Sequence, residues 1–213
     1  MIRIPTYVIN LEKRTDRKQH ILDEFQDKPE FSVSIVKAIE HENGGRGLWL
    51  TISHIIRNLI NHEERLLLLV EDDHEFTNYY NSEFFMHNLL IAESLGADIL
   101  LGGVSWFYNG IPATRNIYSL DTFNATQFVV IFQKFYKKLL KHLDSFSETA
   151  DINFSKIADK KMVVHPFISI QKEFGYSDAT SFNSKNGYVT GIFAYSEKRL
   201  ATLTKILDFY ELP

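Results

Sequence analysis

The chain has no cysteine, no long apolar run and almost no excess of charge of one sign. The lack of cysteine excludes disulfides and thiolate metal sites such as zinc fingers, and it fits a reducing compartment. No segment approaches the roughly 20 apolar residues of a membrane-spanning helix. A net charge of −4 on 213 residues is too small to attract nucleic acid by bulk electrostatics. We therefore expect a globular chain with no nucleic-acid partner and no transmembrane segment.

The first residues, Met1–Pro5, also lack the apolar core and cleavage site of a signal peptide, so we expect a cytoplasmic protein. The length and the 45% apolar content suit a single domain spanning 1–213. The 17 phenylalanines and 10 tyrosines leave room for an apolar surface patch, so peripheral contact with the inner face of a membrane is compatible with the sequence.

The most informative segment is the apolar run Leu66–Val70, which leads directly into three carboxylates, Glu71, Asp72 and Asp73. Such a run is typical of a strand that is buried on both faces. In open α/β sheets, ligands bind in the crevice outside the carboxyl ends of the strands. The acids are therefore expected at a binding site.

Residues two apart in a strand point the same way, so Glu71 and Asp73 are expected to share a face, with Asp72 on the other. Two carboxylates, completed by substrate phosphates and water, are typical ligands of Mg²⁺ or Mn²⁺. The same acids would also suit a solvated strand end without a ligand. An EF-hand is excluded because Phe76 or Asn78 stands where its loop needs glycine.

Apolar periodicity predicts alternating strands and helices, and hence a central, mostly parallel sheet with helices on both faces. Thr15 is a candidate cap for the first helix, and the segment 43–45 is expected to break the chain. The predicted strands lie at 7–11, 31–35, 66–70, 98–103 and 128–132, and the apolar stripes of the helices lie within 21–25, 48–59, 84–91, 135–143 and 200–210.

Four segments resemble glycosyltransferase family 25, the lipopolysaccharide-type glycosyltransferases that are related to the procollagen galactosyltransferases. They occur in the family's order and are spread over most of the chain. The segments are Tyr7–Arg17, with its Asn-Leu pair and spaced arginines; Gly47–His54, with its Ser-His pair; Val70–Asp73, with its Glu-Asp-Asp sequence; and Pro166–Gln171 with the downstream Ser177-Asp178.

The chain departs from the family pattern at three points. Leu50 and Thr51 replace a Gly-Cys pair, and 124–128 is bulkier than the family's small-residue stretch. The chain is also short for the family, so its acceptor loops are expected to be trimmed. None of these differences affects the acids.

The resemblance implies an α/β fold of GT-A-like (Rossmann-like) type, with a donor-binding half at about 1–105 and an acceptor-side half at about 106–213. It further implies transfer of a sugar, with galactose as one candidate, from a nucleotide-sugar donor to a hydroxyl of a lipopolysaccharide or another lipid-linked glycan, with inversion. The expected donor is a UDP-sugar and the expected cofactor is Mn²⁺ or Mg²⁺.

Residue roles follow from the resemblance and from chemistry together. Glu71 and Asp73 would hold the metal, which neutralises charge developing on the leaving diphosphate. Guanidinium groups suit phosphate oxygens, but a solvated turn explains the two arginines equally well, and His54 would also suit a satisfied interior position. The residues assigned to the donor are Asn10, Arg14, Arg17, His54 and Asp72.

Inversion also requires a general base on the acceptor side. Asp151 is the first candidate and Asp178 the second; an ordinary helix cap and a turn, respectively, would explain them without catalysis. The aromatic segment Trp106–Tyr108 follows a predicted strand, where its rings would either stack on a sugar or pack down as a loop.

Two other functions remain open. One is a non-catalytic GT-A-like protein that binds a saccharide or a partner, which the altered 124–128 segment suggests. The other is a nucleotidyltransferase, which also places acids and Mg²⁺ at strand ends but releases pyrophosphate. Nucleotide binding that depends on Mn²⁺ favours an enzyme, and the released product separates the two enzymes.

Overall fold

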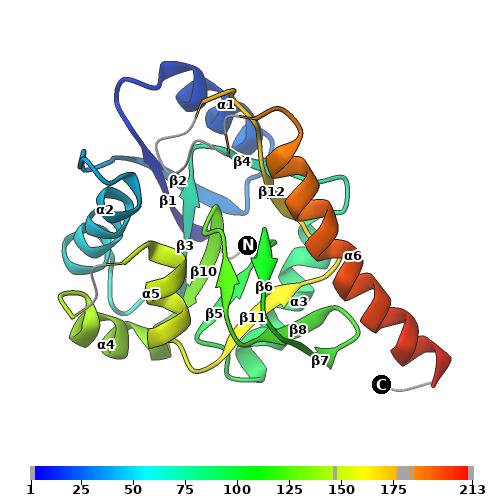
Figure 1. The fold of residues 1–213 in the computed structure, drawn as a ribbon. Helices are drawn as coiled ribbons and strands as arrows, with labels where there is room; N and C mark the ends of the chain where they lie inside the picture. Colours follow the sequence, from blue (N-terminus) through cyan, green and yellow to red (C-terminus); the bar gives the residue numbers. More distant parts are fainter. Residues whose placement is uncertain (1–2, 146–147, 177–182, 184, 211–213) are drawn as a thin grey trace.

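A computed structural model describes residues 3–145, 148–176, 183 and 185–210. In these residues an eight-stranded sheet lies between two layers of helices (Figure 1). The strands of this sheet are β1 (Ile4–Asn10), β2 (Phe31–Lys37), β3 (Leu66–Glu71), β5 (Ile99–Leu101), β7 (Gly110–Thr114), β8 (Ile117–Leu120), β10 (Phe128–Phe132) and β11 (Lys161–Val164). The helices are α1 (Thr15–Phe25), α2 (Gly44–Asn58), α3 (Ser82–Ser94), α4 (Gln133–His142), α5 (Ala150–Ile157) and α6 (Tyr188–Phe209).

The first half of the chain forms the expected β-α-β-α-β unit. Strands β1 and β2 are parallel, and β3 is parallel to β1 on its other side. The order within this unit is therefore β2-β1-β3, so the chain leaves β1 toward one edge of the sheet and returns to the opposite side of β1. A crevice forms at such a reversal because the two crossover connections diverge there.

The complete sheet has the order β2-β1-β3-β10-β5-β11-β8-β7. Strand β10 runs antiparallel to both of its neighbours, and β8 is antiparallel to β11 and β7, whereas the other six strands share one direction. The predicted α/β sheet is confirmed as mostly parallel in strand direction, with β10 as a reversed central strand.

Helices cover both faces of the sheet, as the sequence predicts. Alternate residues of β3 contribute to two separate cores: Leu67 and Leu69 face α2, α4, α5 and α6, whereas Leu68 and Val70 face α1 and α3. In Figure 1, α2, α4 and α5 accordingly gather on one side of the sheet and α6 crosses the front of the molecule. No helix in the described part of the chain is long and apolar enough to cross a membrane.

Two expected helix boundaries are corrected by the structure. The segment 43–45 does not break the chain, because Asn43 caps α2 by accepting a hydrogen bond from the Arg46 backbone N–H, and both glycines lie inside the first turn. At α1 the N-cap residue is Arg14, whose side chain makes no capping bond, and Thr15 is the first helical residue. The helix therefore begins one residue earlier than a Thr15 cap implies.

Two short ribbons flank the carboxyl ends of the central strands. One pairs β4 (His74–Phe76) with β12 (Ser169–Gln171), and the other pairs β6 (Trp106–Phe107) with β9 (Phe123–Asn124). Strands β4, β6 and β12 follow β3, β5 and β11, and β9 leads into the reversed strand β10, so both ribbons lie at the edge of the sheet where β3 ends. They are the frame of the site described next.

Candidate functional site

A cavity of about 400 Å³ opens at the chain reversal between β1 and β3. This volume lies within the range of small-molecule sites, which is about 300–1,000 Å³. The cavity is bounded by the start of α1, the loop before α2, the end of β3 and the end of β12. Its lining includes Ile9, Arg14, Arg17, Ile39, Gly44, Leu48, Glu71, Asp72, Asp73, Gln171 and Asn183.

Asp72 is the buried centre of the site. Its Oδ2 accepts a hydrogen bond of 2.9 Å from Asn10 Nδ2, and its Oδ1 lies 3.2 Å from Arg17 Nη1. Arg14 approaches the same oxygen at 3.7 Å. The sequence predicts that these residues belong together, and the structure brings them together. Asn10, however, uses its amide on Asp72 and on the Arg14 carbonyl and does not line the cavity.

Arg17 connects the acids to the segment that follows β12. Its Nη1 lies 3.2 Å from Asp73 Oδ2 as well as from Asp72, and its Nη2 donates to the Tyr176 carbonyl. The guanidinium also lies 4.6 Å from the Phe174 ring centroid and 4.7 Å from that of Tyr176. Burial opposes its charge, but Asp73 and Asp72 outweigh that effect and raise the pKa of Arg17. Arg17 is therefore a fixed positive charge.

Glu71 is the last residue of β3, and its Oε1 accepts a 2.7 Å hydrogen bond from the hydroxyl of Thr126. Burial, followed by repulsion from Asp73, raises the pKa of Glu71 to about 8, although the Thr126 hydroxyl acts in the opposite direction. In the absence of a cation, this environment therefore disfavours the carboxylate form of Glu71.

Asp73 lies in the turn after β3. Burial raises its pKa to about 6, with Arg17 opposing that rise. Only one of its oxygens has a partner, since Oδ1 is buried without a hydrogen bond. The strand ends at Glu71, so the alternation that was expected to put Glu71 and Asp73 on one face does not extend to Asp73. Both side chains nevertheless line the same cavity.

These two carboxylates fit a divalent cation. Each is disfavoured as an anion by burial and by its acidic neighbours, and Asp73 Oδ1 lacks the partner that a buried oxygen requires. A cation would supply that partner and offset the repulsion. In the described part of the chain, no three histidines or acids form a ready-made metal cluster. Mg²⁺ does not require one, because it commonly takes one or two carboxylates and completes its shell with phosphates and water.

Asp151 lies in the first turn of α5, beside this site. Its Oδ1 accepts from the Ile152 backbone N–H at 2.9 Å and from the Thr149 hydroxyl, and its Oδ2 accepts from the Ala125 N–H at 3.4 Å. The carboxylate thus holds the segment that also carries Thr126, the partner of Glu71. These bonds are those of a helix-start acid, and Asp151 stays a prediction as the base.

Of the two remaining predicted residues, His54 does not line the cavity. His54 is exposed on α2 and contacts Asn58 of the same helix, because the buried face of α2 is formed by its neighbours Ser53 and Ile55. The interior position considered for His54 is therefore wrong. Asp178 lies outside the described residues.

The sequence did not predict a buried polar cluster formed by Gln127, Ser169 and His74, which lies next in the chain to Thr126 and Asp73. Gln127 Nε2 donates to the Gly103 carbonyl at 3.1 Å and to Ser169 Oγ at 3.2 Å, and His74 Nδ1 lies 2.7 Å from that hydroxyl. The cluster fixes the residue after Thr126. The only signal in the sequence was the similarity around Pro166–Gln171, because isolated polar residues in short loops have no periodicity.

A profile of glycosyltransferase family 25, described as an LPS biosynthesis protein, matches residues 3–66. The predicted resemblance is thereby confirmed over that segment, which carries β1, α1, β2 and α2 and ends where β3 begins. The first third of the chain is therefore similar to sugar-transferring enzymes. A search among curated proteins gives no match.

Several solved structures are similar over most of the chain, at low identity. An apo UDP-glucose pyrophosphorylase has 11% identity and a TM-score of 0.49, with 92% of this chain and 82% of that chain covered. A nucleoside-diphosphate-sugar pyrophosphorylase from Vibrio cholerae has 9% identity and a TM-score of 0.42, with 89% and 80% covered. Mouse xyloside xylosyltransferase 1 has 9% identity and a TM-score of 0.39, with 72% and 67% covered. At this similarity they do not distinguish one activity from another.

Proposed function

We propose that this protein is an inverting, metal-dependent glycosyltransferase that moves a sugar from a nucleotide-sugar donor, a UDP-sugar in the simplest case, to a hydroxyl of a lipid-linked or other glycan. The observation that carries the proposal is the pair Glu71 and Asp73, which line a ligand-sized cavity at the chain reversal together with Arg14 and Arg17. The family match over residues 3–66 supports it.

The donor's diphosphate is expected beside the acids. Mn²⁺ or Mg²⁺ bound by Glu71 and Asp73 would supply Lewis-acid stabilisation of the leaving diphosphate. Arg14 lines the cavity and adds positive charge on the same side. Arg17 acts indirectly: its contacts to Asp72 and Asp73 hold the turn that presents the metal ligands. Apolar residues deeper in the cavity, such as Ile9 and Leu48, exclude water from one side of the donor.

Asp151 is the proposed general base. In an inverting displacement, the acceptor oxygen attacks the anomeric carbon as the bond to the diphosphate breaks, and the base takes the hydroxyl proton. Asp151 is joined to the Glu71 side of the site through Ala125 and Thr126. Ala125 is the single non-glycine residue with positive φ in the described part of the chain, at 88°, so this connecting loop is held in a strained conformation.

The test pairs two isosteric substitutions with different expected effects. Asp73→Asn removes a metal ligand, so UDP and Mn²⁺ together should no longer raise Tm, whereas the wild-type protein should respond more to the pair than to either alone. Asp151→Asn should retain that response and lose at least about 100-fold in the transfer rate, as expected for loss of a general base.

Glu83→Gln, an exposed acid at the start of α3, is the matched control and should change neither measurement. Turnover of a nucleotide-sugar panel, followed by nucleotide release, gives the rate. Full donor turnover by Asp73→Asn would remove the metal assignment, and pyrophosphate as the product would indicate a nucleotidyltransferase.

A non-catalytic saccharide-binding protein is the second candidate, and one observation favours it. The Arg17 guanidinium already neutralises part of the acid cluster by contacting both Asp72 and Asp73. In a protein that binds no metal, that ion-pair network would be sufficient to stabilise the turn. Such a protein would show no response of Tm to UDP with Mn²⁺, and Asp73→Asn would lower stability without affecting any nucleotide response.

A further inference from the structure

The β6–β9 ribbon has one buried face and one exposed face, and the exposed face carries two large aromatic rings. Phe107 and Phe123, which are paired across the ribbon, are 2% and 0% exposed. Trp106 and Tyr108, on either side of Phe107, are 42% and 62% exposed. β6 ends at Phe107, but the Tyr108 N–H still bonds the Thr122 carbonyl of the facing segment at 3.0 Å and the Tyr108 side chain is exposed, so Tyr108 lies on the outer face with Trp106.

Polar residues stand opposite these rings. Asn124 is the register partner of Trp106, and the Tyr108 N–H donates to the Thr122 carbonyl. Directly opposed residues of an antiparallel pair lie on the same face, so the exposed Asn124 shares the face of the rings. An aromatic surface edged by an amide suits a sugar, which offers C–H groups to a ring and hydroxyls to an amide.

Helix α6 holds the ribbon through hydrogen bonds to its backbone and through contact with its buried face. Arg199 donates to the carbonyls of Phe107 and Tyr108 at 2.6 and 2.9 Å, and its guanidinium lies 3.9 Å from the Phe107 ring centroid. Ser196 Oγ also donates to the Ser105 carbonyl at 2.7 Å. A rigid surface loses little conformational entropy when a ligand binds, so its exposed rings are suited to recognition.

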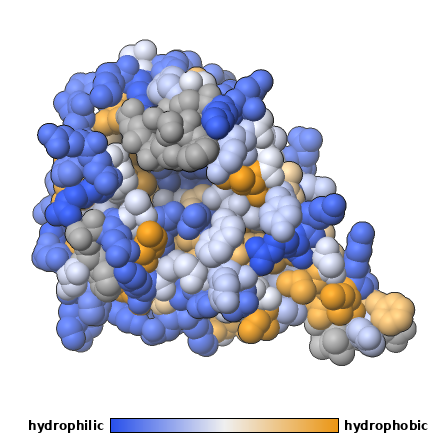
Figure 2. Space-filling view, in the orientation of Figure 1, coloured by the Kyte–Doolittle hydropathy of each residue, from blue (hydrophilic) through white to orange (hydrophobic). Residues whose placement is uncertain are grey.

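The ribbon also lies next to the proposed reaction centre. Asn124 is two residues from Thr126, which bonds Glu71, and two residues of chain span at most about 7 Å. The intervening Ala125 contacts Asp151. Figure 1 shows β6 in the centre of the molecule between α5 and α6, and Figure 2 shows that this face is hollowed above that region. Glu71 thus lies between the cavity and the ribbon.

We propose that Trp106, Tyr108 and Asn124 form the subsite that binds the acceptor, a neutral saccharide whose ring stacks on Trp106. The acceptor role rests on the proposed function. The donor would enter from the cavity side of Glu71, and the saccharide would lie on the ribbon side with its hydroxyl directed toward Asp151. The rings account for affinity, and Asn124 selects the hydroxyl pattern.

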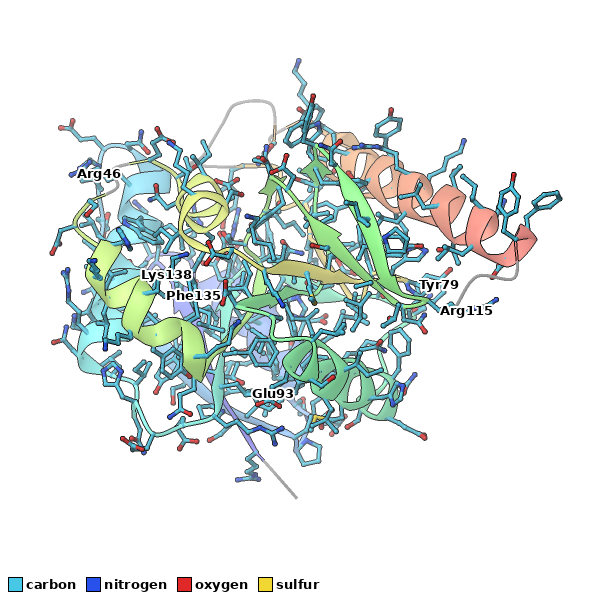
Figure 3. The ribbon with its side chains drawn as sticks, turned by 90° about the horizontal axis from the view of Figure 1, so that it is seen from below. Arg46, Tyr79, Glu93, Arg115, Phe135 and Lys138 are labelled. Atoms are coloured by element: carbon cyan, nitrogen blue, oxygen red, sulfur yellow. The ribbon has the colours of Figure 1, made fainter. Side chains whose placement is uncertain are left out.

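Kinetics test this subsite with two variants and one matched control. Trp106→Ala and Tyr108→Ala should each raise the acceptor KM about tenfold, which corresponds to about 1.4 kcal/mol. Both should leave hydrolysis of the donor by water and the Tm response to UDP with Mn²⁺ unchanged. Tyr79→Ala, which removes a ring that is 56% exposed near the start of α3, should leave the acceptor KM unchanged (Figure 3).

A binding measurement makes the test independent of catalysis. The chain has two tryptophans, and Trp49 is 2% exposed, so iodide quenches the fluorescence of Trp106 selectively. Lactose and cellobiose, which are both neutral, serve as probes. At least one should protect Trp106 of the wild-type protein from iodide, and the protection should be weaker in Tyr108→Ala, which keeps Trp106 as the reporter.

The outcomes separate the two proposals. Unchanged acceptor KM in both ring variants, or no protection by any probe, would overturn the subsite while leaving the proposed function intact. Protection of Trp106 that is weakened by Tyr108→Ala, in a protein with no response to UDP and Mn²⁺ and no donor turnover, would reject the transferase and retain a saccharide-binding surface.

Discussion

At the scale of single residues, the site depends on a few hydrogen bonds between buried or half-buried groups. Asp72 accepts from Asn10 and Arg17 and is thereby fully engaged, whereas Asp73 keeps one oxygen without a partner. Asp72, with both oxygens hydrogen-bonded, suits a structural role, whereas Asp73, with one oxygen available, suits a metal ligand. Sequence spacing separated Glu71 and Asp73 from Asp72 by strand alternation, but it contains no information on which neighbours each acid meets.

Thr126 gives the first residue-scale prediction. Thr126→Val keeps the shape of the side chain and removes the hydroxyl that donates to Glu71 Oε1. Hydrogen bonds to charged groups are worth about 1.5–3 kcal/mol, so Mn²⁺ should bind at least about tenfold more weakly. Electron paramagnetic resonance of free Mn²⁺ measures this affinity directly. Thr122→Val, on the other side of β9 and without a bond to Glu71, is the control. Equal Mn²⁺ affinity in the wild-type protein and both variants would contradict the role given to Thr126.

At the scale of elements, the sequence predicted the first half well and the direction of later strands poorly. The unit from β1 to β3 was readable because each strand and helix has its own periodicity. Phe128–Phe132 is entirely apolar, which correctly indicated a buried strand. An apolar run shows burial on both faces but not direction, and β10 is antiparallel to both neighbours. The two ribbons were missed because strands of two or three residues are too short to show a period.

The junction of β5 with β12 gives an element-scale prediction. A Cβ at Gly103 would lie 2.1 Å from the Ser169 carbonyl oxygen, so Gly103→Ala must push the two segments apart. We expect the free energy of unfolding in urea to fall by about 1–3 kcal/mol, as for overpacked cores. Gly191, inside α6, has open space where a Cβ would lie, with no atom within 4 Å, and Gly191→Ala should raise stability by about 0.5–1 kcal/mol. If Gly103→Ala and Gly191→Ala changed the free energy of unfolding in the same direction, the close contact with Ser169 would not explain the effect at residue 103.

At the scale of the whole molecule, the site is assembled from segments that are distant in the sequence. Arg17, at the start of α1, contacts Asp73 in the turn after β3 and the Tyr176 carbonyl after β12. Glu71, at the end of β3, accepts a hydrogen bond from Thr126 in the 124–127 loop. The family match ends at residue 66, so it covers Asn10, Arg14 and Arg17 but none of the acids. The acids were predictable from the resemblance and from the tendency of ligands to bind at the carboxyl ends of strands. The residues that hold the acids, such as Thr126 and Gln127, were not, because their contacts are tertiary and no local pattern reveals them.

The most direct test of the account is a crystal of the protein grown with Mn²⁺ and UDP, with anomalous scattering used to locate the metal. The account predicts a manganese peak bound by Glu71 and by Asp73 Oδ1, with the diphosphate completing its shell and Arg14 beside it. A nucleotide bound elsewhere, or bound in this cavity with both carboxylates free of metal, would contradict it.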